Sequence, residues 1–284
     1  MARLANGRLH LSDGPIDLII AGEGPGDTMQ RAEEAATARF ATILDELCAE
    51  LPLLRRPTAE APEGPVARRM WRATRPFADE AFITPMAAVA GAVAEEVLAA
   101  MIAAAPLARA MVNNGGDIAF HLSPGAQLRL GLVDRPDAPS LFATTEIVAS
   151  DAIRGVATSG WSGRSFSLGV ADAVTVLAVT ASAADAAATL IANAVDLPGH
   201  PAIARRPATD LQPDSDLGLR LVTTEVGALT HSEVTAALDA GVRRARTYLA
   251  RGLIAAAALH LRGETLTVGT GGRAPSQDLA HARA

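Results

Sequence analysis

Hydrophobic and polar residues alternate along several stretches of the chain, and this period of two predicts β-strands. Within residues 8–21 the alternation reverses around Asp13-Gly14-Pro15, which predicts an N-terminal hairpin. A second hairpin is predicted where Arg262-Gly263-Glu264 separates Leu253–Leu261 from Thr265–Val268. The other predicted strands are Ala110–Asn113, Ile118–Leu122, Gln127–Val133, Phe142–Ala149, Gly155–Ala157, Ala173–Val179 and Leu219–Val222. Their short connections favour antiparallel or mixed pairing.

A helical period separates these strands at other places. The predicted helices are Thr28–Glu50, Pro85–Ala104, Ala183–Val195 and a helix that Thr230 or Ser232 begins and that reaches Tyr248. Proline-rich loops are predicted at residues 52–65 and 198–216, and Gly91 marks a close approach by another backbone. Because no regular βαβ rhythm appears, the sequence predicts an α+β fold of mixed or antiparallel sheets packed with helices. We expect one domain over residues 1–268 and a disordered tail over 269–284.

The composition of the chain excludes several classes of function. The chain has 284 residues and a net charge of −6, with no basic stripe, so we expect no nucleic-acid partner. All 25 basic residues are Arg, which excludes Schiff-base lysine chemistry and a P-loop and leaves Arg as the cation for phosphate. The N-terminus lacks a signal core, and the apolar run Ala81–Ala94 is too short for a bilayer, so we expect a cytoplasmic protein without membrane contact. We expect the single cysteine, Cys48, to be buried and structural.

The first candidate site is Asn113-Asn114-Gly115-Gly116-Asp117. Paired glycines let backbone amides approach a ligand, and the Asn114 and Asp117 side chains offer oxygens to a nucleotide or a hydrated metal. The same residues are equally typical of a tight hairpin turn.

The second candidate site is the loop Thr158-Ser159-Gly160, which Arg164 follows closely. Hydroxyl groups and free amides can bind phosphate oxygens, and the Arg164 guanidinium can add a bidentate contact. The alternative is a polar surface loop.

The third candidate site is a pair of side chains on one helix face, Asp185 and Thr189, at a spacing of four residues. Their hard oxygens suit Mg²⁺, which commonly takes one or two protein carboxylates and completes its shell with water and phosphate. The alternative is a capping box, with Ser182 as the N-cap and Asp185 as its partner.

In this order and separation, the three motifs resemble those of the ApbE-like superfamily, whose best-known members are FAD:protein FMN transferases. The resemblance implies that Asp185 and Thr189 bind Mg²⁺. It also implies that the two loops hold FAD or FMN, through Asn114, Gly115, Gly116, Asp117, Thr158, Ser159, Gly160 and Arg164. The segments Thr84–Glu95, Ser167–Ala173 and Thr189–Asn193 resemble a compact branch of that superfamily.

Two departures from the transferases limit what the resemblance implies. Ala90-Gly91-Ala92 stands where they typically have a Gly-Lys-Gly-like segment, and the short stretch Phe166–Asp172 replaces their histidine-containing loop. We therefore expect a magnesium-dependent protein for FAD, FMN or a related diphosphate, but not a flavinyltransferase for exported proteins. We expect Asp117 or Asp172 to assist catalysis, as the base or as a second metal ligand.

Two alternatives remain open for the function. One is an enzyme of pterin-type one-carbon cofactor biosynthesis, similar to that of tetrahydromethanopterin, and the other is a non-catalytic ligand-binding protein of the same fold. The apolar helix Pro85–Ala104 also suggests a homodimer.

Overall fold

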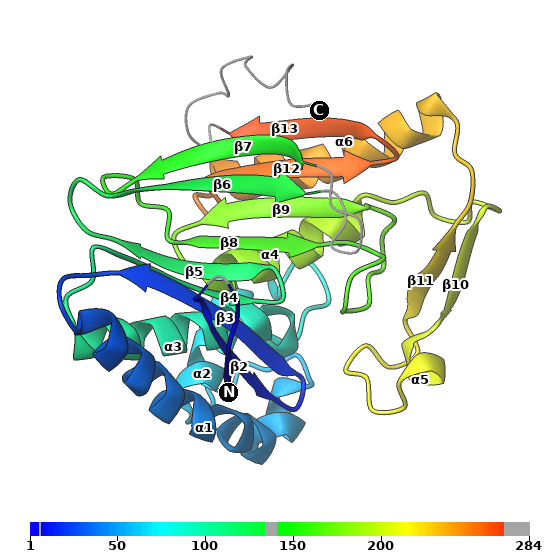
Figure 1. Ribbon diagram of the computed structural model, residues 1–284. Helices are drawn as coiled ribbons and strands as arrows, with labels where there is room; N and C mark the ends of the chain where they lie inside the picture. The colour runs from blue at the N-terminus through cyan, green and yellow to red at the C-terminus, as the bar shows by residue number, and fades with distance from the viewer. Residues whose placement is uncertain (6, 134–140, 270–284) are drawn as a thin grey trace.

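One antiparallel sheet runs through the molecule (Figure 1). The computed structural model describes residues 1–5, 7–133 and 141–269, and within them nine strands pair in the order β1-β2-β3-β4-β5-β8-β9-β12-β13. Their bounds are Ala2–Arg3 (β1), Leu9–Asp13 (β2), Ile16–Glu23 (β3), Arg109–Asn114 (β4), Asp117–Leu122 (β5), Gly155–Ser159 (β8), Ala173–Ala178 (β9), Ala256–Leu261 (β12) and Glu264–Gly269 (β13). Both predicted terminal hairpins, β2–β3 and β12–β13, are confirmed.

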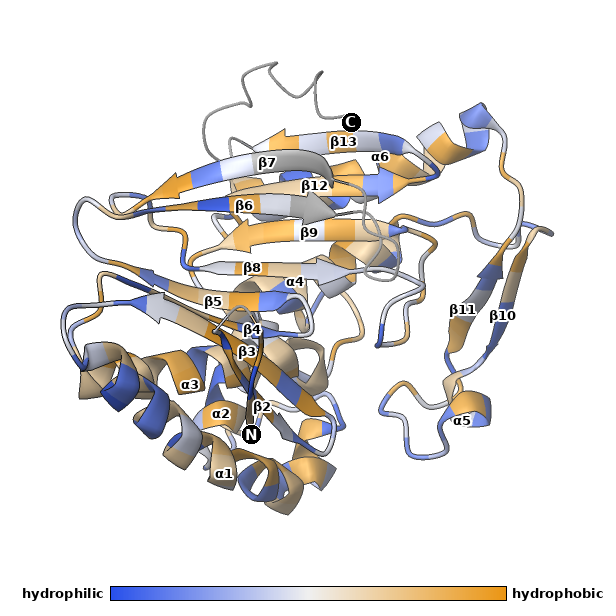
Figure 2. Ribbon diagram, viewed as in Figure 1, coloured by the Kyte–Doolittle hydropathy of each residue, from blue (hydrophilic) through white to orange (hydrophobic). Residues whose placement is uncertain are grey.

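Helices cover one face of this sheet. These helices are Thr28–Leu54 (α1), Pro65–Thr74 (α2), Val89–Ala104 (α3), Ala181–Ala194 (α4) and His231–Ala250 (α6), with 3₁₀ turns at Arg75–Phe77 (η1) and Pro85–Ala88 (η2). The short helix Ala208–Leu211 (α5) lies away from the sheet (Figure 1). Alternate strand residues such as Val112, Ala119 and Val176 point to this face and form the main core with α1, α3, α4 and α6. Figure 2 shows β9 as hydrophobic along nearly its whole length, as burial demands. The predicted α+β class is confirmed.

A separate hairpin lies against the other face of the sheet. It consists of β6 (Gln127–Val133) and β7 (Leu141–Val148), and its residues Leu130 and Ile147 form a second core with Phe120, Val156 and Leu177. Because neighbouring residues in a strand point to opposite faces, membership of one core or the other shows where each strand side chain points.

The structure corrects the predicted proline loop at residues 52–65. Helix α1 continues through Pro52 to Leu54, since a proline in the last turn removes few helical hydrogen bonds. Pro65 begins α2, a position where its missing N–H has no helical partner to lose. The Glu50 carboxylate accepts the N–H groups of Glu63 and Gly64 at this helix start. Pro65 was the available sequence signal for α2.

A two-stranded arm replaces most of the second predicted loop. We call residues 203–226 the arm: it contains β10 (Ile203–Pro207), α5 and β11 (Leu221–Val226), and Figure 1 shows it beyond one end of the main sheet. The N–H of Thr223 donates to the carbonyl of Ser167, and Arg220 lies over the ring of Phe82 at 3.2 Å. The strands of the arm are short and contain few buried residues, so their sequence pattern is weak.

Helix α3 with its preceding turn, Pro85–Ala104, is long and apolar enough to cross a membrane by length and composition alone. In the fold it is a core helix, which packs on α1, α2, α4, β4 and β5. Its two acids, Glu95 and Glu96, are ion-paired to Arg69. The surface that suggested a homodimer is therefore largely covered, and the homodimer stays a prediction.

Two smaller expectations concern Cys48 and the C-terminal tail. Cys48 is exposed rather than buried, because the buried stripe of α1 passes through Phe40, Ile43 and Leu47. Residues 270–284, most of the predicted tail, lie outside the described residues.

Candidate functional site

The β4–β5 turn brings the first motif to one end of the sheet. Asn114 pairs with Asp117 across the turn, and Gly115 and Gly116 have φ angles of +65° and +115°, which favour glycine. The N–H of Gly116 donates to the Asn113 side chain at 2.8 Å. The tight-hairpin interpretation of this motif is thus confirmed, and the turn also fixes the two side chains that flank it.

Those flanking side chains point to the helix-covered face. Buried Asn114 lies two residues after Val112 and so points to the same face. Its side-chain amide donates to the carbonyl of Ala90 at the start of α3 (3.1 Å). Asp117 lies two residues before Ala119 and points to the same face. Its carboxylate accepts the N–H of Thr158 at 3.1 Å. Both side chains therefore lie on the face that α3 covers, and Asn114 contacts the N-terminal end of that helix.

Burial raises the pKa of Asp117 to about 7, although the Thr158 N–H and the positive charge of Arg164 act in the opposite direction. The residue as a whole is half-buried. A carboxyl group with such a pKa exchanges its proton near neutral pH.

Asp185 reaches the same place from α4. Its carboxylate accepts the N–H of Gly91 at 3.0 Å and a further backbone hydrogen bond from Ala90. These are the second and third residues of α3, whose N–H groups have no partner within their own helix. The third motif therefore binds the N-terminus of α3 with one of its two side chains.

Gly91 makes this contact possible, as its prediction as a close-approach position indicated. A Cβ atom at Gly91 would lie 2.4 Å from the carbonyl oxygen of Ala181, the first residue of α4.

The capping-box alternative for Asp185 is wrong. Thr180 is the N-cap of α4 and accepts the N–H of Ala183 at 3.2 Å, because the helix begins two residues earlier than predicted.

The carboxylates of Asp117 and Asp185 interact across the site. Burial raises the pKa of Asp185 well above its ordinary value, and the charge of Asp117 raises it further, as does that of Glu95, against the backbone N–H groups of Gly91 and Ala90. Two carboxylates in one desolvated place are stabilised by a shared proton or by a cation. Half-buried Thr189, one helical turn along α4, adds a hydroxyl oxygen.

This donor set suits magnesium. No group of three or more His, Cys, Asp or Glu side chains that could hold a metal occurs among the described residues. The described residues therefore do not include a metal site built from protein side chains alone. Mg²⁺ does not require one, because it needs only one or two carboxylates when phosphate and water complete its shell.

The second motif is divided between the two faces of the sheet. The Thr158 hydroxyl hydrogen-bonds the Thr175 hydroxyl at 2.9 Å. Its neighbour Ala157 points into the main core, so the Thr158 side chain points to the opposite face, away from Asp185. Only its backbone N–H serves the carboxylate site. The half-buried Ser159 lies on the helix-covered face, on the same side as Asp117. A Cβ atom at Gly160 would lie 2.3 Å from the carbonyl oxygen of Asp172.

Arg164 lies over two turns at the edge of the site. Its guanidinium donates to the carbonyl of Pro15 at 2.8 Å, and a Cβ atom on Gly115 would lie 2.7 Å from it. The side chain is exposed and its charge acts on Asp117. The structure therefore places a positive charge close enough to Asp117 to act on its carboxylate.

Asp172 has a different environment. One carboxylate oxygen accepts the indole N–H of Trp161 at 3.1 Å, and the other accepts the N–H of Arg262 at 2.6 Å. These bonds join the loop after β8 to the β12–β13 turn. The structure therefore places Asp172 as a link between loops, while Asp117 lies beside Asp185.

The sequence motifs missed two contributors to the site. One is the pair of N–H groups of Ala90 and Gly91, which donate to Asp185 instead of to their own helix. The other is Glu95, which accepts the N–H of Ser182 at 2.6 Å. Acidic residues inside an apolar helix need partners when they are buried. The Glu95-Glu96 pair was thus an available signal.

A family model described as AbpE bacteria matches residues 1–267, so the chain belongs to that family. The resemblance to the ApbE-like superfamily is thereby confirmed.

Curated relatives match about half of the chain. A UPF0280 protein from Methanopyrus kandleri is 44% identical over 135 residues, which are 47% of this chain and 49% of that protein. A UPF0280 protein from Methanothrix thermoacetophila is 40% identical over 141 residues, 49% of this chain and 55% of that protein. The chain thus matches about half the length of these relatives.

Among solved structures, the apo form of the Pseudomonas stutzeri flavinyl transferase ApbE covers 89% of this chain and 89% of its own. The TM-score is 0.46 and the sequence identity is 13%. Values this low say nothing of a shared activity.

Proposed function

We propose that this protein binds a flavin nucleotide, FAD or FMN, or a related diphosphate, together with Mg²⁺, at the site between the sheet end and helices α3 and α4. The observation that carries the proposal is the proximity of the Asp117 and Asp185 carboxylates: burial raises the pKa of both, and the charge of Asp117 raises the pKa of Asp185 further. A divalent cation beside them would remove the repulsion and bring phosphate oxygens with it. Family membership supports the flavin part of the proposal.

In this proposal Asp185 and Thr189 are the metal ligands. They lie one helical turn apart, both half-buried, and the Asp185 carboxylate is held by the N-terminus of α3. Bound Mg²⁺ would neutralise negative charge on phosphate oxygens.

The anionic part of the ligand has its own partners. Arg164 supplies a positive charge near Asp117, and the Gly115-Gly116 turn lets backbone approach a ligand without Cβ atoms in the way. Ser159 offers a hydroxyl on the same face of the sheet. Gly160 shapes the loop between this hydroxyl and Arg164, because only glycine fits against Asp172 there.

If the ligand reacts, we propose Asp117 as the base, in preference to Asp172. A pKa of about 7 lets Asp117 accept a proton near neutral pH, and its carboxylate lies at the site. Both oxygens of Asp172 are held by N–H donors of neighbouring loops. The absence of lysine and of the transferases' histidine loop argues against flavinylation of exported proteins.

A ligand panel tests this proposal. FAD, FMN, ATP and a reduced pterin are each titrated into the purified protein by calorimetry, with Mg²⁺ and with EDTA. We expect FAD or FMN to bind, more tightly with Mg²⁺. Binding of the pterin alone would instead favour one-carbon cofactor biosynthesis, and binding of ATP with equal affinity would show that the diphosphate, rather than the flavin, is recognised.

A further inference from the structure

Glu95 lies between the candidate site and an ion-pair network of the helices. Its side chain is 11% exposed, one carboxylate oxygen accepts the N–H of Ser182 at 2.6 Å, and the other pairs with Arg69 of α2 at 3.1 Å. Ser182 is the second residue of α4, so its N–H has no partner within that helix. A carboxylate at this position satisfies the N–H and also interacts favourably with the helix dipole.

The two helices therefore cap each other. Asp185 of α4 accepts N–H groups from the first turn of α3, and Glu95 of α3 accepts an N–H from the first turn of α4. Gly91 allows the backbones to approach closely enough for both contacts. Ser182 and Asp185 are three residues apart on the same helix, so fixing one restricts the other.

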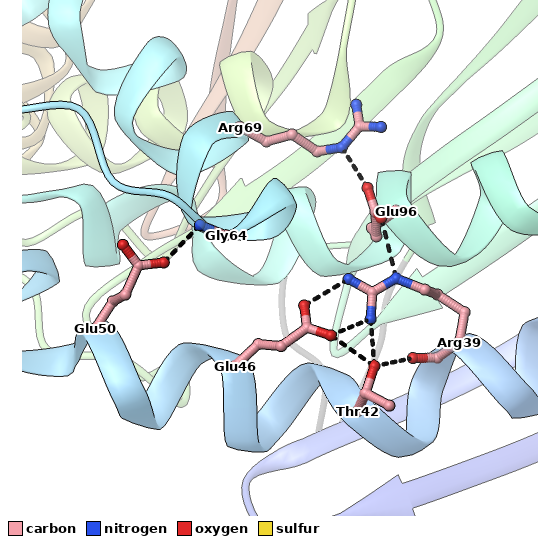
Figure 3. A network of polar contacts seen from close by, with 7 residues as sticks. All are labelled: Arg39, Thr42, Glu46, Glu50, Gly64, Arg69 and Glu96. Carbon is pink, nitrogen blue, oxygen red and sulfur yellow. Dashed lines mark hydrogen bonds and ion pairs between the residues drawn. The ribbon is translucent and has the colours of Figure 1, made fainter.

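The neighbouring Glu96 is a natural comparison, because it takes part in the same network without the contact to α4. Its oxygens pair with Arg39 of α1 at 3.0 Å and with Arg69 at 2.9 Å, and Arg39 in turn pairs with Glu46 (Figure 3). Its exposure, 14%, is similar to that of Glu95. The two acids thus differ chiefly in what the second oxygen binds.

We propose that Glu95 is a positioning residue, which fixes the first turn of α4 and thereby aims the Asp185 carboxylate into the site. This inference rests on the proposed function for its effect on ligand binding. Arg69 binds the other oxygen of Glu95, which leaves one oxygen for the Ser182 N–H.

The variants Glu95→Ala, Glu95→Gln and Glu96→Ala separate positioning from general stability. Glu95→Gln keeps a carbonyl oxygen for the Ser182 N–H but loses the ion pair, and Glu96→Ala loses ion pairs of the same network. The measurement is a Mg²⁺ titration at saturating FAD. Glu95→Ala should weaken the apparent Mg²⁺ affinity about tenfold, as expected for loss of a charge-assisted hydrogen bond, while the other two variants stay within about threefold of wild type. Equal weakening by Glu96→Ala, or no recovery in Glu95→Gln, would overturn the proposal.

Hydrogen exchange without ligand gives a second readout that does not depend on the proposed function. Exchange of the Ser182 and Ala183 amides should be at least about tenfold faster in Glu95→Ala than in Glu96→Ala. If wild type shows no magnesium-dependent FAD binding, the proposed function fails while this difference still supports the positioning role. Equal exchange in the two variants would refute that role.

Discussion

The N–H of Gly91 donates a 3.0 Å hydrogen bond to the Asp185 carboxylate, which joins the start of one buried helix to the second turn of another. Helix N-termini favour anions, so this contact stabilises the ionised form of Asp185, while burial and Asp117 oppose it. The Ala90-Gly91-Ala92 segment thus has a role of its own at the place where transferases typically have a lysine.

Substitution Gly91→Ala should destabilise the fold. In an ordinary helix this change stabilises by about 1 kcal/mol, but here the new Cβ atom would lie 2.4 Å from the Ala181 carbonyl. We expect a net loss of about 1–3 kcal/mol in the free energy of unfolding by urea denaturation. A gain in stability would contradict the close approach of α3 and α4.

The stability of the metal-free protein should fall as pH rises from 5 to 8. The folded pKa of Asp117, about 7, lies above the ordinary unfolded value, so the folded state binds more protons between the two and loses this advantage as pH rises. Glu233 also has a shifted pKa: the N–H of Thr230 and the side chain of His200 lower it to about 2. Because that value lies below pH 5, the ionisation of folded Glu233 does not change between pH 5 and 8.

Urea denaturation of Asp117→Asn measures the Asp117 contribution. The wild-type loss over this range should exceed that of Asp117→Asn by about 1–2 kcal/mol, allowing for partial exposure. Asp239→Asn, an exposed change on α6, is the control and should behave as wild type. Identical pH profiles for Asp117→Asn and wild type would refute the raised pKa.

Arg164→Ala should weaken nucleotide binding more than it weakens the fold. The exposed guanidinium makes a hydrogen bond to the Pro15 carbonyl, so the stability cost should stay below about 1 kcal/mol. Loss of its contact to phosphate should reduce FAD affinity about tenfold in a calorimetric titration. Arg243→Ala, an exposed arginine on α6, should leave the affinity unchanged. Equal affinities for both variants would remove Arg164 from the ligand site.

Thr223→Val should be neutral or stabilising. The Thr223 hydroxyl is buried and has no hydrogen-bond partner among the described residues, so a methyl group in its place removes an uncompensated polar atom. We expect a gain of up to about 1 kcal/mol in thermal denaturation. Thr175→Val is the control: its hydroxyl is equally buried but bonded to Thr158, so that change should cost about 1 kcal/mol. A larger loss in Thr223→Val than in Thr175→Val would show that the Thr223 hydroxyl has a partner.

Local patterns predicted the elements that local residues determine. Gly115-Gly116 and Arg262-Gly263 lie in two-residue hairpin turns, and the alternation around them gave β4, β5, β12 and β13 within a few residues. Gly91 was predicted as a close-approach position because an apolar helix has few other reasons for glycine. In the arm, the predicted strand Leu219–Val222 overlaps β11, whereas β10 was missed because it is short and has no buried residue. The pairing of the two strands joins residues 14 to 23 positions apart, which no local pattern reveals.

The geometry of the site was less accessible to the sequence. Spacing brought out Asp117 and Asp185, but only the order of strands and helices shows that they meet while Asp172 turns to Trp161 and Arg262. Nor does the Thr158-Ser159 pair reveal which hydroxyl faces the helices. That depends on strand register, since a shift of one residue exchanges the two faces.

The most direct measurement of the central claim is FAD binding to Asp185→Ala and wild type, each with Mg²⁺ and with EDTA. Asp239→Ala serves as the control for loss of an exposed acid. We predict that Mg²⁺ tightens FAD binding at least about tenfold in wild type and in Asp239→Ala, and that Asp185→Ala loses this enhancement while it stays folded. An undiminished magnesium enhancement in Asp185→Ala would contradict the account.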